Sequence, residues 1–90
     1  MNFNKGDIIT HSCGCIGLYY DDSGINKRVR IYLKKCGSEK YNPKIRKECT
    51  YFSDPRLATE EEKSEFKKAL IKVGLYYSES NKTILENNEF

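Results

Sequence analysis

The amino-acid sequence predicts an α+β fold in which one amphipathic helix covers a small curled antiparallel sheet. Two observations indicate this class. Short apolar runs separated by turn-forming residues fill the first 52 positions, and a helix with recognisable signals at both ends follows them. At 90 residues the chain is long enough for one modest core. We therefore expect a single globular domain over residues 1–86 and a frayed tail at 87–90.

The first two strands are separated by a polar, cysteine-containing segment. A Gly-Asp bend at residues 6–7 leads into the first strand, and residues 15–20 form the second. Residues 21–24 mark a hairpin-type break after it. Because side chains alternate along a strand, one ring of the pair Tyr19 and Tyr20 should face the core. The outward ring is then available as an interface anchor.

The segment over residues 28–36 has the clearest strand pattern in the chain. Val29, Ile31 and Leu33 alternate with basic residues and a tyrosine, which predicts one apolar face and one basic face. Residues 37–46 are polar and contain a proline, so we expect them to form a loop of about ten residues.

The helix is the most strongly predicted element. It is expected over about residues 60–73, after a short strand at 48–52. Thr59 is a suitable N-cap, and Glu62 three residues later completes a capping box. Gly74 is placed to end the helix in the left-handed conformation. The acidic residues of the first turn are explained by capping and by the helix dipole.

The C-terminal segment predicts a small closing hairpin. Residues 75–77 and 82–85 are mainly apolar or aromatic, and they flank a polar turn around residues 80–81. With the upstream strands they give a small curled antiparallel sheet or a Src-homology-3-like open barrel of about 4–6 strands. The helix would cover one face or one opening of this sheet.

Basic residues are concentrated in the N-terminal half, although the net charge is only +3. Residues 1–47 hold ten Lys/Arg against four Asp/Glu, a balance of +6, whereas residues 48–90 hold six against nine, a balance of −3. This imbalance predicts one surface able to attract an acidic partner. The residues predicted to bind the partner are Arg28, Arg30, Tyr32, Lys34, Lys35, Lys40, Tyr41, Lys44, Arg46 and Lys47.

A group of possible metal ligands lies near the N-terminus. His11, Cys13 and Cys15 recur every second residue and would share one face of a strand, and Cys36 or Cys49 could complete a tetrahedral Zn²⁺ site. Common structural zinc sites have two closely spaced cysteine pairs, and the second pair is missing here. This favours ordinary buried thiols over a metal site or a disulfide, so we expect no cofactor. A nucleophile–base pair with His11 is disfavoured, because i and i+2 side chains of a strand are too far apart for a good direct hydrogen bond unless the strand bends.

Much of the chain also resembles a known family. The residues that carry the resemblance are Phe3, Gly-Asp-Ile-Ile at 6–9, Cys-Ile-Gly-Leu-Tyr at 15–19, Ser-Asp-Pro-Arg-Leu-Ala-Thr at 53–59, Glu-Glu-Glu-Lys at 60–63, Phe66, Ala-Leu at 69–70, Gly-Leu-Tyr-Tyr at 74–77 and Lys-Thr-Ile-Leu at 82–85. With them the chain resembles small uncharacterised proteins that are abundant in gut Bacteroidetes and their prophages. The resemblance implies a mobile-element setting and a cytoplasmic protein of a bacterial host, with no catalytic residues to carry over. It favours a protein that binds and blocks a host factor, such as a component of an antiviral defence system.

We therefore expect a non-enzymatic small binding protein. The phosphate-binding loop, the serine nucleophile elbow, the zinc-protease helix motif and the dinucleotide fingerprint are all missing from the sequence. The expected partner is a host protein or protein complex, and the alternative is single-stranded nucleic acid bound by the same basic face. A zinc-stapled scaffold is the second alternative. No apolar run approaches the about 20 residues that span a bilayer, so we expect no membrane partner.

Overall fold

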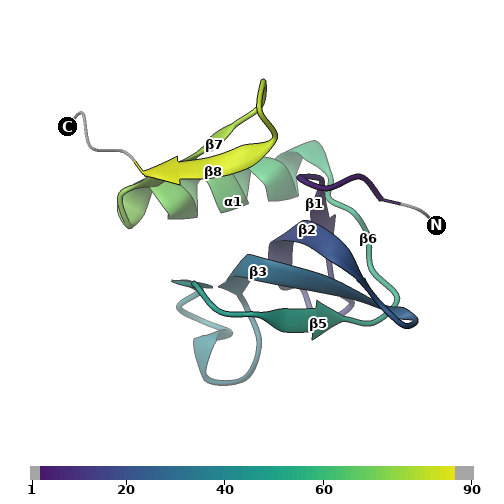
Figure 1. Cartoon of the computed structure of the whole chain (residues 1–90). Coiled ribbons are helices and arrows are strands. Elements are labelled where there is room, and N and C mark those ends of the chain that lie inside the picture. The colour runs from purple at the N-terminus through teal and green to yellow at the C-terminus, as the bar shows by residue number, and fades with distance from the viewer. Residues whose placement is uncertain (1–2, 87–90) are drawn as a thin grey trace.

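The computed structural model describes residues 3–86, so the tail predicted at 87–90 lies outside the described residues. An antiparallel sheet forms one layer, and the single described helix lies across it (Figure 1). The predicted α+β class is confirmed. The elements are β1 (Ile8–Thr10), β2 (Ile16–Ser23), β3 (Asn26–Lys34), the 3₁₀ turn η1 (Gly37–Glu39), β4 (Lys44–Arg46), β5 (Thr50–Phe52), β6 (Arg56–Leu57), α1 (Glu60–Lys72), β7 (Leu75–Ser78) and β8 (Thr83–Glu86).

The large sheet curls but does not close. Its strand order is β4-β3-β2-β1-β6, and β5 also pairs with β3, beside β4. Residues 53–55 alone connect β5 to β6, yet these two strands are not paired with each other in the described part of the chain. The sheet is therefore an open one and not a closed barrel. Strands β7 and β8 pair separately as a two-stranded sheet.

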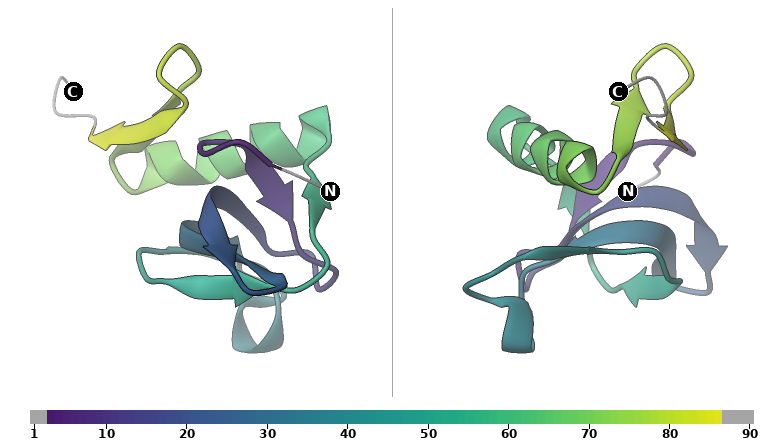
Figure 2. Two further views of the ribbon diagram at one scale, coloured as in Figure 1. Left: turned by 45° about the vertical axis from the view of Figure 1, so that its right-hand side comes forward. Right: turned by 90° about the vertical axis from the view of Figure 1, so that its left-hand side faces the viewer.

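Apolar side chains of the large sheet form two separate core clusters. Figure 2 shows α1 and the β7–β8 pair side by side on the same side of the sheet. The core cluster between these layers contains Ile8, Ile16, Leu33, Ala58, Phe66, Leu70 and Leu75. The second cluster is built by β1, β2, β3, β5 and the residue before β2, and contains Ile9, Cys15, Tyr19, Val29, Tyr32 and Phe52. The chain of 90 residues thus buries two apolar clusters, which stabilise the fold by removing apolar surface from water.

Two register shifts interrupt the pairing of β2 with β3. At the first shift, between Gly17 and Tyr19 of β2, the facing segment of β3 is one residue longer. At the second shift, between Tyr19 and Asp21, β2 has the extra residue, so each strand carries a β-bulge. A bulge reverses the alternation of side chains along a strand. As a result Val29 joins the cluster of Tyr32, whereas Ile31 and Leu33 face the helix. The prediction that Val29, Ile31 and Leu33 share one face is therefore wrong. The pairs around the shifts are Gly17↔Tyr32, Tyr19↔Val29 and Asp21↔Arg28.

The ends of α1 follow the sequence prediction closely. The hydroxyl of Thr59 accepts a hydrogen bond from the amide of Glu62 at 3.2 Å, and the Glu62 carboxylate accepts one from the amide of Thr59 at 2.8 Å. The capping box is thus confirmed. The guanidinium of Arg56 also contacts Glu62 and, together with these amide bonds, lowers the pKa of Glu62 to about 2 against a smaller effect of burial. Gly74 follows the helix with φ of +80°, as its predicted stop requires.

The segment predicted as a loop over residues 37–46 is partly regular. It contains η1 and then β4, which pairs with the last residues of β3, with Ile45 opposite Leu33. Ile45 packs against the core cluster under α1. This apolar contact explains why the last residues of an otherwise polar segment form a strand. Strand β2 also continues past the predicted break and turns at Gly24 and Ile25.

The N-terminal turn is fastened to the β7–β8 pair. Gly6 has φ of +95°, and a Cβ atom at this position would lie 2.2 Å from the carbonyl oxygen of Lys82. The Tyr77 hydroxyl donates a hydrogen bond to the carbonyl oxygen of Gly6 at 2.7 Å, and the Lys82 ammonium contacts the Asp7 carboxylate at 2.5 Å. Only a glycine allows this approach of two backbones.

Candidate functional site

The residues predicted to bind a partner do not form one continuous basic face. Arg28, Arg30, Tyr32 and Lys34 lie on β3, whereas the others follow it in the η1 segment, in β4 or just after β4. Several of the cations are engaged by acids of this chain. The ion pairs that do this are Arg28–Asp21, Lys34–Glu39, Lys35–Glu65 and Arg46–Glu39.

Glu39 neutralises the centre of the predicted basic block. Its side chain is buried, with 6% of the residue exposed, and it contacts both Lys34 at 3.5 Å and Arg46. The hydroxyl of Ser38 and the guanidinium of Arg46 hold the pKa of Glu39 below its ordinary value, although burial opposes them. A carboxylate held in this way reduces the charge that Lys34 and Arg46 present to a partner. Glu39 is the single acidic residue between positions 27 and 47 of the sequence, but its position between two cations is not evident from the sequence.

The two tyrosines of the predicted site have opposite environments. Tyr32 is 7% exposed, and its hydroxyl donates a hydrogen bond to Glu48 at 2.9 Å. Its ring therefore cannot stack on a ligand, which corrects the prediction. Tyr41 is 91% exposed, and the ammonium of Lys40 lies 5.5 Å from its ring centroid. Lys40, Lys44 and Lys47 have no carboxylate within salt-bridge distance among residues 3–86.

The two β-bulges bring a different set of cations together around Tyr20. The Arg30 guanidinium lies 3.8 Å from the centroid of the Tyr20 ring, and the Lys5 ammonium lies 4.5 Å from it. Arg28 is third at 5.4 Å, but Asp21 neutralises it. Tyr19 is buried and Tyr20 is half-buried, so the predicted inward and outward placement of this pair is confirmed.

Tyr20 and Arg30 line a surface cleft of about 510 Å³, which we name the Tyr20 cleft. Its lining residues are Lys5, Gly6, Leu18, Tyr19, Tyr20, Arg30, Ile31, Asn81, Lys82, Thr83 and Ile84. Aliphatic side chains thus stand beside three cations, and none of these lining residues is acidic. Of the three cations, Lys82 is paired with Asp7, while Lys5 and Arg30 have no carboxylate partner among residues 3–86. The lining residues come from four parts of the chain: the N-terminal turn, β2, β3 and the β7–β8 turn with the start of β8.

A second hollow of similar size lies between β4 and α1. It has a volume of about 520 Å³ and includes Lys44 of the predicted site, together with Lys68 and Lys72. Glu65 also lines it and is paired with Lys35. No aromatic ring lines it. Because it contains its own acid and no aromatic residue, this hollow is less suited to an anionic group than the Tyr20 cleft.

The predicted metal ligands lie on a turn and not on a strand. Residues 11–15 form the β1–β2 connection, in which the Gly14 amide donates to the His11 carbonyl oxygen at 2.9 Å. The tight turn brings His11 Nδ1 to 3.1 Å from the Cys13 sulfur. The expected separation of these two side chains holds for an unbent strand, and the turn at residues 11–15 is the bend that brings them into contact. The other ring nitrogen of His11 lies 3.2 Å from the Ser53 hydroxyl.

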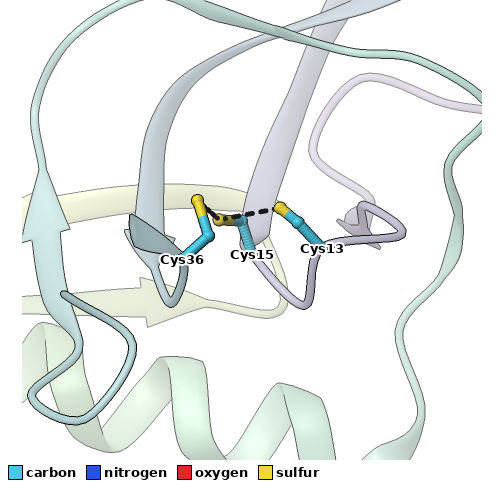
Figure 3. Close-up of side chains that lie close together, drawn as sticks. All are labelled: Cys13, Cys15 and Cys36. Carbon is cyan, nitrogen blue, oxygen red and sulfur yellow. Dashed lines mark hydrogen bonds between the residues drawn. The ribbon is translucent and has the colours of Figure 1, made fainter. Parts of the chain in front are cut away.

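Three of the four cysteines meet at one point, as Figure 3 shows. The sulfur of Cys15 lies 3.2 Å from that of Cys13 and 3.5 Å from that of Cys36, and all three sulfurs are within 4.8 Å of one another. Pairing of β2 with β3 is the cause, because it aligns the residue before β2 with the chain just beyond the end of β3. Cys49 is exposed and does not belong to this cluster.

The three sulfurs differ in their environment. Burial, together with the neighbouring thiols, raises the pKa of Cys15 to about 12. For Cys13 burial acts in the same direction, but hydrogen bonds from the Cys15 amide and from His11 outweigh it and lower the pKa of Cys13 to about 7. The Lys35 amide also donates to the Cys15 sulfur at 3.4 Å. The cluster therefore combines an exposed acidic thiol with a buried one.

Comparisons with known proteins return no matching family model, no similar curated protein and no solved structure of significant similarity. The resemblance to small prophage-associated proteins stays a prediction. Within residues 3–86 no helix combines the length and the apolar character that crossing a bilayer requires.

Proposed function

We propose that this chain is a non-enzymatic binding protein whose Tyr20 cleft captures an acidic segment of a partner protein. One observation carries the proposal. Lys5 and Arg30 converge on the ring of Tyr20, beside a hollow with an aliphatic lining and without a carboxylate of its own.

The electrostatics of the cleft favour an anionic ligand. Lys5 and Arg30 place two positive charges at one ring, and neither has a salt-bridge partner among residues 3–86, so the cleft attracts an incoming carboxylate. A hydrogen bond between Arg30 and a carboxylate contributes about 1.5–3 kcal/mol when it is shielded from water. Leu18, Ile31 and Ile84 offer apolar surface for a neighbouring aliphatic or aromatic side chain of the ligand. The ligand class is thus an acidic peptide segment with an apolar anchor.

A protein partner fits the surface better than single-stranded nucleic acid does. Strands of nucleic acid are bound by rows of cations and by aromatic rings that stack on bases. Here Tyr32 is buried, cations already lie against Tyr20, and four basic residues of the predicted face are paired with acids. Tyr41 is the exposed ring of the predicted site and lies outside the Tyr20 cleft.

The resemblance to prophage-associated proteins suggests the kind of partner. A protein of a mobile element that binds stoichiometrically acts most directly by occupying a functional surface of a host protein. Our concrete proposal is inhibition of a host component of antiviral defence. Such a component would present acidic residues at the surface that this protein covers.

Two charge-reversal variants test the proposal. Arg30→Glu and Lys47→Glu each change the net charge from +3 to +1, but only Arg30 lines the cleft. Each protein is immobilised and exposed to lysate of a bacterial host, and retained proteins are identified by mass spectrometry. We expect a stoichiometric partner that binds the wild type and Lys47→Glu but is lost with Arg30→Glu. Equal retention by all three proteins, or no retained protein at all, would contradict the proposal.

A titration with labelled oligonucleotides separates the nucleic-acid alternative. Phosphate contacts make affinity fall steeply between low and moderate salt concentration. We expect no salt-sensitive binding of single-stranded DNA or RNA at micromolar protein. Tight, salt-sensitive binding that Lys47→Glu weakens as much as Arg30→Glu would replace our proposal with the alternative.

A further inference from the structure

The cysteine cluster is not used by the proposed binding function, and its geometry has a separate explanation. We propose that Cys13, Cys15, Cys36 and His11 form a tetrahedral Zn²⁺ site that fastens the β1–β2 turn to the end of β3. The site is independent of the Tyr20 cleft, because none of its four residues lines that cleft.

The sulfur separations are close to those of a metal site. With Zn–S bonds of about 2.3 Å, tetrahedral geometry places two sulfurs about 3.8 Å apart. The observed separations of 3.2 Å and 3.5 Å from Cys15 need only a small expansion to reach this value. A disulfide would instead require two sulfurs to approach to about 2.05 Å. Three thiols at mutual contact suit one shared cation better than a bond between two of them.

His11 is the natural fourth ligand. Its Nδ1 atom lies 3.1 Å from the Cys13 sulfur, so this nitrogen faces the cluster. Its Nε2 atom faces the Ser53 hydroxyl, and the ring lies against Phe52 with centroids 5.2 Å apart. Metal-bound histidines commonly have their second nitrogen held by a polar group in this way. The group of ligand atoms that all lie within 4.8 Å of one another contains the three sulfurs but not His11, so the ring must move toward Cys15 and Cys36 to complete an S₃N set.

The surroundings of the cluster suit thiolates. The Lys35 amide points at the Cys15 sulfur, and N–H groups directed at sulfur stabilise the negative charge of a metal-bound thiolate. Cys15 is 4% exposed and Cys36 packs against the adjoining core cluster, so water has little access from that side. Cys13 is exposed, which gives the ion a route of entry.

Zinc would act as a structural staple. It would join Cys13, which precedes β2, to Cys36, which follows the end of β3. The whole β2–β3 hairpin lies between these two residues in the sequence. A closed set of four protein ligands leaves no open coordination position, as in structural zinc sites. We therefore expect the ion to stabilise the fold and not to perform a reaction.

Metal titration of the full chain tests the site. The protein is prepared without an affinity tag, reduced, freed of metal and titrated with Co²⁺ and then with Zn²⁺ against a chromophoric chelator. We expect one ion per chain and the intense visible absorption of tetrahedral, sulfur-bound Co²⁺. With free Zn²⁺ at 100 times its Kd, the melting temperature should rise by about 10–20 °C. Absence of the Co²⁺ spectrum, or binding of less than one ion per several chains, would overturn the proposal.

Single substitutions assign the ligands. Cys36→Ser should weaken Zn²⁺ binding by at least about 100-fold, because even the loss of an outer hydrogen bond costs 10–100-fold. Cys49→Ser is the matched control and should bind like the wild type. Equal loss in both variants would show that the proposed ligand set is wrong. His11→Ala should weaken binding and change the Co²⁺ spectrum, and an unchanged spectrum would remove His11 from the set.

Discussion

Replacement of Gly6 by alanine is expected to destabilise the protein strongly, because two costs act together. The φ angle of +95° is left-handed, which costs a residue with a side chain about 1–2 kcal/mol. The new Cβ would also lie 2.2 Å from the Lys82 carbonyl oxygen, and since such contacts are not made below 3.0 Å, this carbonyl must move by about 0.8 Å. That movement strains the Tyr77–Gly6 hydrogen bond, worth about 0.5–1.5 kcal/mol.

The expected sum for Gly6→Ala is about 1.5–3.5 kcal/mol, which corresponds to about 8–20 °C in melting temperature for a domain of this size. Gly74→Ala provides the control, because its φ is +80° but a Cβ there meets no atom within 4 Å. The control should lose only about 1–2 kcal/mol. Thermal melts followed by circular dichroism would measure both variants. If Gly6→Ala melts no lower than Gly74→Ala, the close docking of the N-terminal turn on the β7–β8 pair is refuted.

Three further results are expected from stability measurements. Glu62→Ala should lose about 1–2 kcal/mol in urea unfolding, and Glu62→Gln less, because glutamine keeps the hydrogen bond to the Thr59 amide. The folded pKa of Glu62, about 2, lies below its ordinary 4.5, so its stabilisation is complete above pH 4.5 and declines as the pH falls toward 2. The difference between wild type and Glu62→Gln should therefore shrink on going from pH 6 to pH 3, and an unchanged difference would contradict the ion pair. Phe66→Ala empties a fully buried site and should cost about 3–5 kcal/mol, and a loss below about 1 kcal/mol would contradict the assigned core.

The helix was predictable from the sequence because its determinants are local. Thr59, Glu62 and Gly74 act within a few residues of the helix ends, and the apolar stripe through Phe66 and Leu70 needs no knowledge of its partner. The structure confirms each of these assignments. The α+β class was predictable for the same reason, since turn residues between short apolar runs are also local signals.

The faces of β3 were not predictable, because they depend on pairing with β2. A strand of regular alternation would place Val29 with Ile31, and the bulge that β3 carries between Val29 and Tyr32 separates them. Strand β4 was missed for a related reason. The pairing of β4 with β3 and the packing of the partly buried Ile45 against the cluster under α1 are contacts between distant segments, which a polar composition does not reveal.

The candidate sites show the same limit. Lys5, Tyr20, Arg30 and Lys82 come from four separate segments. The sequence indicated the outward position of Tyr20 and Arg30 as a binding residue, but not that Lys5 and Lys82 would lie beside them. The sequence did single out the cysteines, but it placed them on a strand and could not separate Cys36 from Cys49. The positive φ of Gly14 belongs to the turn that carries Cys13 and Cys15, and the pairing of β2 with β3 brings Cys36, and not Cys49, next to them.

The Tyr20 cleft as the binding surface is the central claim, and site-specific photo-cross-linking tests it most directly. A photoreactive phenylalanine derivative is placed at Asn81, an exposed residue on the cleft rim, or at Tyr41, the exposed ring of the basic segment after β3. Each protein is irradiated with the captured partner, and adducts are identified by mass spectrometry. Our account predicts an adduct from position 81 and little or none from position 41. An adduct from position 41 alone would contradict it.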